Sequence, residues 1–396
     1  MGPGLGLRPN RDDNRRGRWD CVPYMSGEEF SERTMAESGL ARWGGRLAFA
    51  ASQGSRVAWY AGQGAVMRRM TKRIAEREKL PKPNIKRPEG PVPDMRAMLR
   101  DVAALMARDL ANVEAGHYPP PADEDAPLAE MIATSRAFFR DVPAVLRRQR
   151  LGLAHDVVDS NQDDGRASAT GRPDYYMQNF HFQTGGWMTD ESARIYDMQV
   201  EVLFSGAANA MRRQALVPIA EELRGRDQRR VAYADIATGT GVFLPQLRRA
   251  FPRLPVVAVD LSEPYLRQAA RRMGRAPKIA PVVAKAEALP FGDASLDLAT
   301  CVYLFHELPP EVRRAVAAEM ARVVKPGGLL VVVDSLQTGD DSGYDGLLTL
   351  FPQLFHEPYF ETYLGDGLED VFGAAGFLPE GTANAFLSKV VRLRRG

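Results

Sequence analysis

The segment from Val231 to Gly241, Val-Ala-Tyr-Ala-Asp-Ile-Ala-Thr-Gly-Thr-Gly, constrains the fold of this chain more than any other stretch. Its first six residues are apolar apart from Asp235 and predict a short buried strand. A turn with two glycines follows, and residues 242–251 predict a helix. In a strand–turn–helix unit the glycines let the backbone pass close under a ligand, and the helix N-terminus offers oriented N–H groups. The segment therefore predicts a loop that binds a nucleotide.

The composition of this turn excludes two common nucleotide loops. The Gly-x-Gly-x-x-Gly loop of dinucleotide enzymes needs a third glycine at position 244, which is Leu244. No Gly-Lys-Ser/Thr follows the turn, so it is not a P-loop. The match is to Asp-x-Gly-x-Gly-x-Gly, with Ala237 in place of the first glycine. The acid at the end of the strand indicates S-adenosylmethionine as the ligand.

Beyond residue 230 the chain alternates between apolar runs and helical patterns. Strands are predicted at residues 231–236, 255–260, 279–283, 296–303 and 329–334, near 377 and at 386–393. Helices are predicted at residues 242–251, 263–273, 310–324 and 364–375. Apolar strands separated by helices indicate a mostly parallel sheet covered on both faces, which is a doubly wound α/β fold.

Ligands of such folds bind beyond the carboxyl ends of the strands. We therefore expect the turn at 237–241, Asp260 and the segments 284–289 and 303–308 around one crevice. Asp260 follows the turn by about twenty residues, the spacing at which an acid after the second strand meets ribose hydroxyls. One carboxylate can accept from two vicinal hydroxyls. A helix N-cap is the alternative role for Asp260.

The first 229 residues lack this alternation and divide into two predicted regions. Residues 1–93 carry more Arg and Lys than Asp and Glu, and we expect a basic region, partly disordered or helical. It is predicted to be disordered to about residue 20, helical over 26–78 and a proline-rich linker over 79–93. Residues 94–229 are predicted to form a helical lid that caps the substrate, with helices at about 95–110, 126–140, 143–151, 191–204 and 207–223. Residues 230–396 then form the cofactor-binding, Rossmann-like domain.

Composition narrows the remaining classes. A hydrophobic content of 45% and a charged content of 26% are typical of a globular protein in water, and a net charge of +2 gives no signal for a polyanionic partner. The two cysteines, Cys21 and Cys301, permit neither a disulfide framework nor a zinc site. No apolar run reaches the length of a membrane span and no signal-peptide core is present, so we expect a cytoplasmic protein. Because histidines and carboxylates do not cluster at ligand spacing along the chain, we expect no metal site.

Four motifs in the second half resemble one family. They are Asp235-Ile-Ala-Thr-Gly-Thr-Gly241, Ala258-Val-Asp-Leu-Ser262, Ala286-Glu-Ala-Leu-Pro-Phe-Gly-Asp-Ala-Ser-Leu-Asp297 and Glu319-Met-Ala-Arg-Val-Val-Lys-Pro-Gly-Gly-Leu-Leu330. In order and spacing the chain resembles the class I S-adenosylmethionine-dependent methyltransferases, and within them the ubiquinone/menaquinone C-methyltransferase-like group. The resemblance covers about residues 230–335. It implies a seven-stranded sheet with an antiparallel last strand and S-adenosylmethionine as methyl donor.

The resemblance also implies a set of cofactor-binding residues. The methionine end would contact Asp235 and the turn, the ribose Asp260, and the adenine Leu261, with Ala286 and Glu287 at its edge. Lys285 stands where these enzymes usually carry an acid, which puts recognition of the adenine amino group there in doubt. The complete expected set is Asp235, Ala237, Thr238, Gly239, Gly241, Asp260, Leu261, Ala286, Glu287 and Tyr303.

Candidate catalytic and substrate-binding residues lie in three other segments. His306 follows the fourth strand and, with an ordinary pKa of about 6.5, could accept a proton from a nucleophile. The segment 173–187 holds five aromatic residues and a histidine, which suits a pocket wall. The expected catalytic residues are His306, His356 and Tyr176, and the expected substrate-binding residues are Tyr175, His181, Gln183, Trp187 and Tyr359. The alternatives are a loop-ordering histidine and a core plug of aromatics. For Glu307, the residue after His306, we expect a structural or capping role.

The leading interpretation is a methyltransferase that acts on a small molecule in an aromatic-lined pocket. The first alternative keeps fold and cofactor but attacks another carbon of the sulfonium, by aminocarboxypropyl transfer or cyclisation that releases methylthioadenosine. A second is a non-catalytic, cofactor-binding scaffold. Nucleic acid is a disfavoured partner because no Asn/Asp-Pro-Pro-Tyr motif follows the fourth strand. The oligomeric state stays open, a dimer included.

Overall fold

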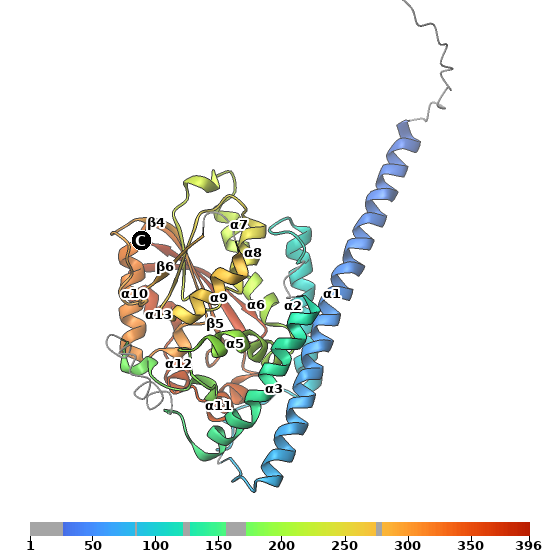
Figure 1. Ribbon diagram of the computed structural model, residues 1–396. Helices are drawn as coiled ribbons and strands as arrows, with labels where there is room; N and C mark the ends of the chain where they lie inside the picture. The colour runs from blue at the N-terminus through green and yellow to red at the C-terminus, as the bar shows by residue number, and fades with distance from the viewer. Residues whose placement is uncertain (1–26, 84, 122–126, 156–171, 275–278) are drawn as a thin grey trace, which may run out of the picture. The chain divides into compact units, whose positions relative to one another are not determined.

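The computed structural model describes residues 27–83, 85–121, 127–155, 172–274 and 279–396 (Figure 1). The first twenty residues, for which disorder is predicted, lie outside the described residues. Cys21 and most of the polar connection after residue 156 also lie outside them. The chain divides into two compact units, Met1–Ala48 and Phe49–Gly396. The first contains the beginning of helix α1 (Gly27–Arg77), and the second contains every other element.

The second unit is built on a seven-stranded sheet with the order β3-β2-β1-β4-β5-β7-β6. Strands β1 to β5 are parallel to their neighbours, and β7 is antiparallel to both β5 and β6. The strands are β1 (Tyr233–Ile236), β2 (Val256–Asp260), β3 (Ile279–Val283), β4 (Leu296–Val302), β5 (Val324–Ser335), β6 (Phe377–Ala385) and β7 (Ser388–Arg395). The predicted doubly wound, mostly parallel sheet with an antiparallel last strand is confirmed.

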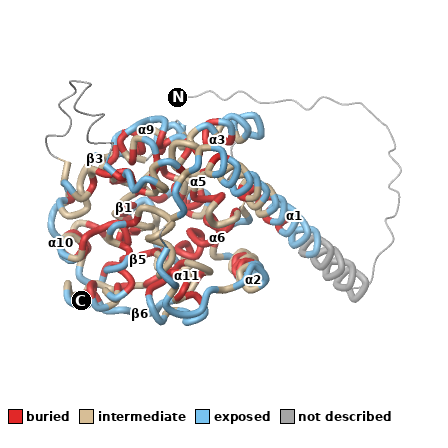
Figure 2. Tube along the Cα trace, turned by 90° about the horizontal axis from the view of Figure 1, so that it is seen from below, coloured by how far each residue is buried: buried red, intermediate tan, exposed pale blue. Residues whose placement is uncertain are grey.

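Helices cover both faces of the sheet because successive side chains of a strand point to opposite faces. In β1, Tyr233 packs in the core under α8 and α9, while Ala234 and Ile236 pack in the core under α10 and α13. The run 329–333 of β5 is apolar throughout since both of its faces are buried. Figure 2 shows β5 as largely buried. The covering helices are α7 (Leu216–Glu222), α8 (Phe243–Ala250), α9 (Glu263–Met273), α10 (Pro310–Val323) and α13 (Leu368–Ala374).

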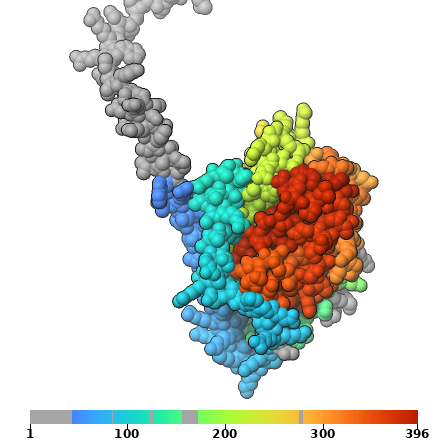
Figure 3. Space-filling view, turned by 180° about the vertical axis from the view of Figure 1, so that it is seen from behind, coloured from blue at the N-terminus to red at the C-terminus, as the bar shows by residue number. Residues whose placement is uncertain are grey.

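Strand β6 forms one edge of the sheet. Its residues from Leu378 to Thr382 are exposed, and in Figure 3 the C-terminal part of the chain, in red, forms a broad patch of the visible surface. The strand order reverses its direction between β1 and β4. Strands β2 and β3 lie on one side of β1, and strands β4 and β5 lie on the other. The carboxyl ends of β1 and β4 therefore mark the switch point at which such sheets bind ligands.

Two helices of the N-terminal half differ from prediction. The helix expected to break before Pro143 is continuous as α3 (Leu128–Leu151), because Phe138, Val142 and Leu146 continue one buried stripe across the proline. The helix expected over 207–223 is instead two short helices, α6 (Ala208–Arg213) and α7, because Pro218 cannot donate to the carbonyl of Gln214 four residues earlier.

The other predicted helices of this half are present. They are α2 (Met95–Glu114) and α5 (Asp190–Leu203), and Asp94 caps α2 as expected by accepting from the backbone N–H of Ala97 at 2.7 Å. Near the C-terminus, α11 (Asp345–Leu354) and α12 (Phe360–Leu364) form an insertion before α13. None of the helices in the described part of the chain has the length and apolar character that crossing a membrane requires.

Candidate cofactor and substrate site

One cavity opens to solvent at the switch point of the sheet. Its walls come from the turn after β1, the ends of β2 and β4, the segment after β3, and aromatic residues of the N-terminal half. Of the expected residues, those that line it are Asp235, Ala237, Thr238, Gly239, Asp260, Leu261, Ala286, Glu287, Tyr303, Tyr175, Tyr176 and Trp187. The carboxyl ends of the strands and the aromatic segment therefore line the same cavity.

The turn after β1 takes its shape from three residues with positive φ. They are Ala237 at 59°, Gly239 at 60° and Gly241 at 74°. Gly241 does not line the cavity. A side chain there would meet Ala269 of α9, since an added Cβ would lie 2.6 Å from the Ala269 Cβ. Gly241 thus lets α9 pack against the turn, while Gly239 keeps the wall of the cavity free of side-chain atoms.

Asp235 supports the turn from within the sheet. Its side chain is buried and accepts hydrogen bonds from the hydroxyls of Thr300 at 2.6 Å and Thr238 at 2.8 Å. Burial raises the pKa of Asp235 to about 6, although the two hydroxyls oppose the shift. The residue both lines the cavity and fixes Thr238, so it can present the turn to the methionine end of the cofactor.

Asp260 ends β2 and connects it to the turn. One carboxylate oxygen accepts from the backbone N–H of Gly239 and the other from that of Ser262, both at 2.7 Å. Ser262 is the N-cap of α9, so the alternative N-cap role for Asp260 is wrong. Burial raises its pKa to about 6. Since Asp260 lines the cavity and each oxygen can accept a further hydrogen bond, the carboxylate suits two ribose hydroxyls.

An unexpected contact lies in the part of the cavity wall where the adenine is expected. Leu261, Lys285 and Ala286 line the cavity there, and the carboxylate of Glu287 accepts a hydrogen bond from the hydroxyl of Tyr175 at 2.8 Å. Burial and this bond raise the pKa of Tyr175, so the phenol stays protonated and remains a donor. The contact attaches the aromatic segment to the sheet at the place where the adenine edge is expected.

The aromatic segment has no single periodicity because it is built from two 3₁₀ turns, η1 (Asp174–Tyr176) and η2 (Phe180–Phe182). Trp187 lies in the wall, and the ring of Phe180 stacks on its outer face with centroids 3.9 Å apart. The Trp187 carbonyl accepts from the Ser262 hydroxyl at 2.5 Å, a second attachment to the sheet domain. These stacked rings give the cavity a rigid apolar side.

Several expected residues lie outside the cavity wall. Gln183 is fully buried and donates to Ser192 at the start of α5, which is a structural role. The His356 ring contacts the Gln178 side chain at 2.7 Å, and burial lowers its pKa to about 4. The expected residues that do not line the cavity are Gly241, His306, His356, His181, Gln183 and Tyr359. Tyr176 is the expected catalytic residue that lines it.

His306 is buried behind the wall. Its Nδ1 lies 2.6 Å from an Asp334 carboxylate oxygen at the end of β5. Burial lowers the pKa of His306, but the charge and hydrogen bond of Asp334 outweigh burial and raise the pKa above its ordinary value. The backbone N–H of Phe305 also donates to Asp334, so the pair orders the 3₁₀ turn η4 (Phe305–Glu307).

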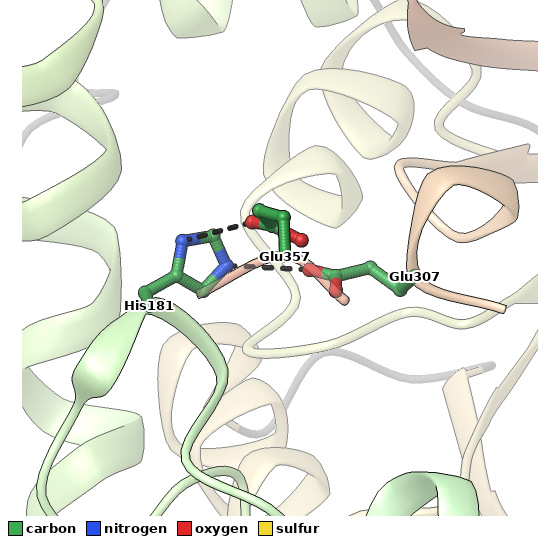
Figure 4. Close-up of side chains that lie close together, drawn as sticks. All are labelled: His181, Glu307 and Glu357. Atoms are coloured by element: carbon green, nitrogen blue, oxygen red, sulfur yellow. Dashed lines mark hydrogen bonds and ion pairs between the residues drawn. The ribbon is translucent and has the colours of Figure 1, made fainter. Parts of the chain in front are cut away.

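Glu307, the residue after His306, lines the cavity in its place. Its Oε1 lies 3.2 Å from Nε2 of His181, whose Nδ1 lies 3.2 Å from Oε1 of Glu357 (Figure 4). Burial raises the pKa of Glu307, but the His181 hydrogen bond and the charge of His306 outweigh it, so the pKa is lowered. Burial raises the pKa of Glu357 well above its ordinary value. From the sequence, residues 303–308 are expected at the crevice, and Glu307 lies within this range.

Three further lining residues were missed, Tyr196 of α5, Arg212 of α6 and Tyr265 of α9. They lie on helices whose patterns also fit ordinary core faces, so no sequence signal separates them from packing residues. Arg212 lies over the ring of Tyr303 at 5.4 Å and lies 3.7 Å from Glu201. The cavity therefore holds a buried cation beside the aromatic rings as well as the carboxylate of Glu307.

Comparison with known proteins matches this region to one family. A family model described as a methyltransferase domain matches residues 234–328. A demethylmenaquinone methyltransferase of Beutenbergia cavernae is 34% identical over 43% of this chain and 65% of the relative. One of Thermus thermophilus is 32% identical over 49% of this chain and 82% of the relative. The ubiquinone/menaquinone biosynthesis C-methyltransferase UbiE of Desulfotalea psychrophila is 31% identical over 37% of this chain and 56% of the relative.

The extent of these matches differs between relatives. The chain spans 65% of the first relative's length and 56% of the third, which is less than two thirds of each. The second is matched over 82% of its length at 32% identity. On this match, and on the sheet order and the turn that precede it, the chain belongs to the class I S-adenosylmethionine-dependent methyltransferases, in the ubiquinone/menaquinone C-methyltransferase-like group.

Proposed function

We propose that this chain transfers the methyl group of S-adenosylmethionine to a small molecule held in the aromatic-lined cavity. The observation that carries the proposal is that the cofactor turn and the aromatic segment line the same cavity.

The residues present fit the cofactor. Gly239, where an added Cβ would meet nothing within 4 Å, leaves the cavity floor open, and Asp260 presents acceptors where a ribose is expected. When bound, S-adenosylmethionine supplies an electrophilic methyl group on a sulfonium. The chain's own contribution is to hold this group and a nucleophile in line, which can supply much of the rate enhancement.

The aromatic residues suit both partners of the transfer. Tyr176, Trp187 and Tyr303 line the cavity beside the cofactor turn. Their ring faces can stabilise the sulfonium by cation–π attraction and exclude water from the transfer. Flat apolar walls also favour a flat substrate. Because the relatives are named for demethylmenaquinone and ubiquinone/menaquinone, quinone-type rings are the first substrates to test.

We assign the lid role to the helical region 94–229. It contributes Tyr175, Tyr176 and Trp187 from the aromatic segment and Tyr196 and Arg212 from helices to the cavity wall. The region 230–396 contributes the cofactor turn. The two regions therefore divide the work, the second holding the cofactor and the first shaping the substrate side.

Analysis of the cofactor-derived product tests this proposal against its alternatives. The purified chain is incubated with S-adenosylmethionine and a demethylated quinol, because the electron-rich ring of the reduced form can attack the methyl group and then lose a proton from the same carbon. Methyl transfer yields adenosylhomocysteine, whereas attack at the aminocarboxypropyl chain or cyclisation yields methylthioadenosine. Cofactor binding without turnover of any substrate class would indicate a scaffold. The cofactor assignment itself fails if calorimetry detects no S-adenosylmethionine binding, or if Asp260→Ala leaves the affinity unchanged.

A further inference from the structure

We propose that His181, Glu307 and Glu357 form a binding site for one divalent metal cation beside the cavity, with Glu307 in its wall. The three residues come from separate segments, since His181 lies in η2, Glu307 ends η4 and Glu357 precedes α12. One possible ligand atom from each lies within 4.8 Å of the others, so a single cation can contact all three (Figure 4). Spacing along the chain could not reveal this site, because only folding brings the segments together.

The cluster places two carboxylates in a buried environment. The side chains of Glu307 and Glu357 are 4% and 0% exposed, and that of His181 is 12% exposed. Moving a carboxylate out of water is costly unless positive charge and hydrogen bonds compensate it. One imidazole carries at most one positive charge, which cannot balance two ionised carboxylates. The cluster therefore calls for a further positive charge or a bound proton.

Hydrogen bonding within the described residues leaves this cluster incomplete. His181 Nε2 and Glu307 Oε1 form a hydrogen bond at 3.2 Å. Oε2 of Glu307 and both oxygens of Glu357 accept no hydrogen bond from a donor group in the described part of the chain, although Nδ1 of His181 lies 3.2 Å from Glu357 and the two carboxylates lie close enough to share a proton. Buried polar atoms are normally satisfied. In Figure 4 one oxygen of Glu307 and one of Glu357 face the imidazole of His181.

A hydrogen-bonded chain without metal is the alternative, because each imidazole nitrogen of His181 faces a different carboxylate. In the metal site, one of these carboxylates instead turns from its imidazole nitrogen to the cation, so that both carboxylates and the other nitrogen contact it. His306 and Asp334 lie behind the cluster, with Nε2 of His306 3.6 Å from Glu307, and can hold Glu307 in place as an outer shell.

The ligand set narrows the kind of cation. Two carboxylates and one imidazole suit Mn²⁺, Zn²⁺ or Fe²⁺, whereas Ca²⁺ requires six to eight oxygen ligands. Three protein ligands leave coordination positions open. Because Glu307 lines the cavity, a cation bound to it would lie beside the space expected to hold the substrate. A cation there can bind and polarise a substrate oxygen.

Metal titration of the full-length chain tests this site. The protein is treated with a chelator, which is then removed, and titrated with Mn²⁺ and with Zn²⁺ by calorimetry. We expect one equivalent per chain, with the affinity reduced about tenfold or more in Glu307→Gln and in Glu357→Gln, since each removes a charged ligand. Glu361→Gln, at an exposed position of the next helix, is the matched control and should bind as the unsubstituted chain does.

Two results would overturn the proposal: no stoichiometric binding of either cation, or binding that both Glu→Gln variants retain unchanged. If these variants fail to fold, crystals of the unsubstituted protein soaked in Mn²⁺ decide the question. An anomalous peak about 2.0–2.3 Å from all three side chains supports the site, and no peak there refutes it. These readouts need no turnover, so the metal site and the proposed methyl transfer can fail independently.

Discussion

Gly239 and Gly241 occupy similar backbone conformations but serve different needs. Both have positive φ, yet an added Cβ meets nothing within 4 Å at Gly239 and the Ala269 Cβ at 2.6 Å at Gly241. Backbone strain at a left-handed position costs an alanine roughly 1–2 kcal/mol. Overpacking adds roughly 1–3 kcal/mol where the neighbour is backbone or a short side chain. The two glycines thus separate strain from crowding.

We therefore predict that Gly241→Ala lowers the free energy of unfolding by roughly 2–5 kcal/mol, and Gly239→Ala by only about 1–2 kcal/mol. Urea denaturation without cofactor measures both, with Gly239→Ala as the matched control for strain. Equal losses in the two variants would contradict crowding against α9 as the reason for Gly241.

A second prediction concerns the charge on Asp260. Burial raises its pKa to about 6, so the carboxylate is ionised above this pH and protonated below it. The ionised form is the acceptor that ribose hydroxyls require. We expect the affinity for S-adenosylmethionine to rise as pH rises through about 6, and to be at least roughly tenfold weaker at pH 5 than at pH 8. Asp235, whose pKa is also about 6, loses its proton over the same pH range, so its titration acts in the same direction.

Calorimetry between pH 5 and pH 8 measures this dependence, with circular dichroism to confirm that the chain stays folded. Asp260→Asn cannot ionise at this position, so it should bind more weakly at pH 8 and show a smaller pH dependence. If the dissociation constant of the unsubstituted chain is the same at pH 5 and pH 8, titration of these acids has no effect on cofactor binding.

At the level of elements, periodicity predicted the strands of the sheet closely and the helices less so. Fully apolar strands bounded by turns left little choice, and β3 and α9 have the predicted limits. The breaks were harder because they depend on packing. Pro143 is tolerated inside α3 by a continuous buried face, whereas Pro218 separates α6 from α7. Local sequence does not show which proline a tertiary contact will accommodate.

The candidate site divides in the same way. The cofactor residues follow one strand–turn–helix motif, so spacing alone placed Asp235, Asp260 and the turn at the cavity. Contacts between distant segments could not be predicted. His306 and Glu307 are adjacent in sequence, yet only Glu307 lines the cavity, because His306 pairs with Asp334 of β5. The roles of these two neighbours depend on which side of a 3₁₀ turn meets the sheet.

The aromatic segment provides a prediction for one whole element. Its contact with the sheet includes the hydrogen bond from Tyr175 to Glu287. A hydrogen bond to a charged group contributes roughly 1.5–3 kcal/mol. We expect Tyr175→Phe to weaken the docking of residues 173–187, with faster hydrogen exchange there and a weaker affinity for the cofactor.

Hydrogen–deuterium exchange monitored by mass spectrometry measures this change peptide by peptide. Tyr344→Phe is the matched control, because its hydroxyl also donates to a carboxylate, that of Asp101 at 2.7 Å, but lies outside both the segment 173–187 and the cavity wall. It should leave exchange near Glu287 and cofactor affinity unchanged. If Tyr175→Phe also leaves exchange over 173–187 unchanged, packing of the rings rather than this bond holds the segment.

At the scale of the whole molecule, the helices from residue 49 onward and the sheet form one compact unit. A buried ion pair connects three of these helices. Asp109 of α2 lies 2.5 Å from the guanidinium of Arg213 in α6, and the same guanidinium donates to Gln53 of α1 at 3.3 Å. Asp109 also accepts from the Tyr118 hydroxyl at 2.7 Å. Asp109 and Arg213 are 0% and 1% exposed, so neither charge has water to compensate it.

Removing one partner of a buried pair leaves the other charge uncompensated, which typically costs 3–5 kcal/mol, whereas replacing both with apolar residues is often neutral. We therefore expect Asp109→Leu to lower the free energy of unfolding by about 3–5 kcal/mol, and the double variant Asp109→Leu/Arg213→Met to recover most of that loss. Urea denaturation measures both. Glu191→Gln, which breaks an exposed pair with Arg194, is the control and should change stability by less than about 0.5 kcal/mol. If the double variant is as unstable as the single one, the hydrogen bonds of Asp109 with Tyr118 and the packing around Arg213, rather than the balance of buried charge, hold the helices together.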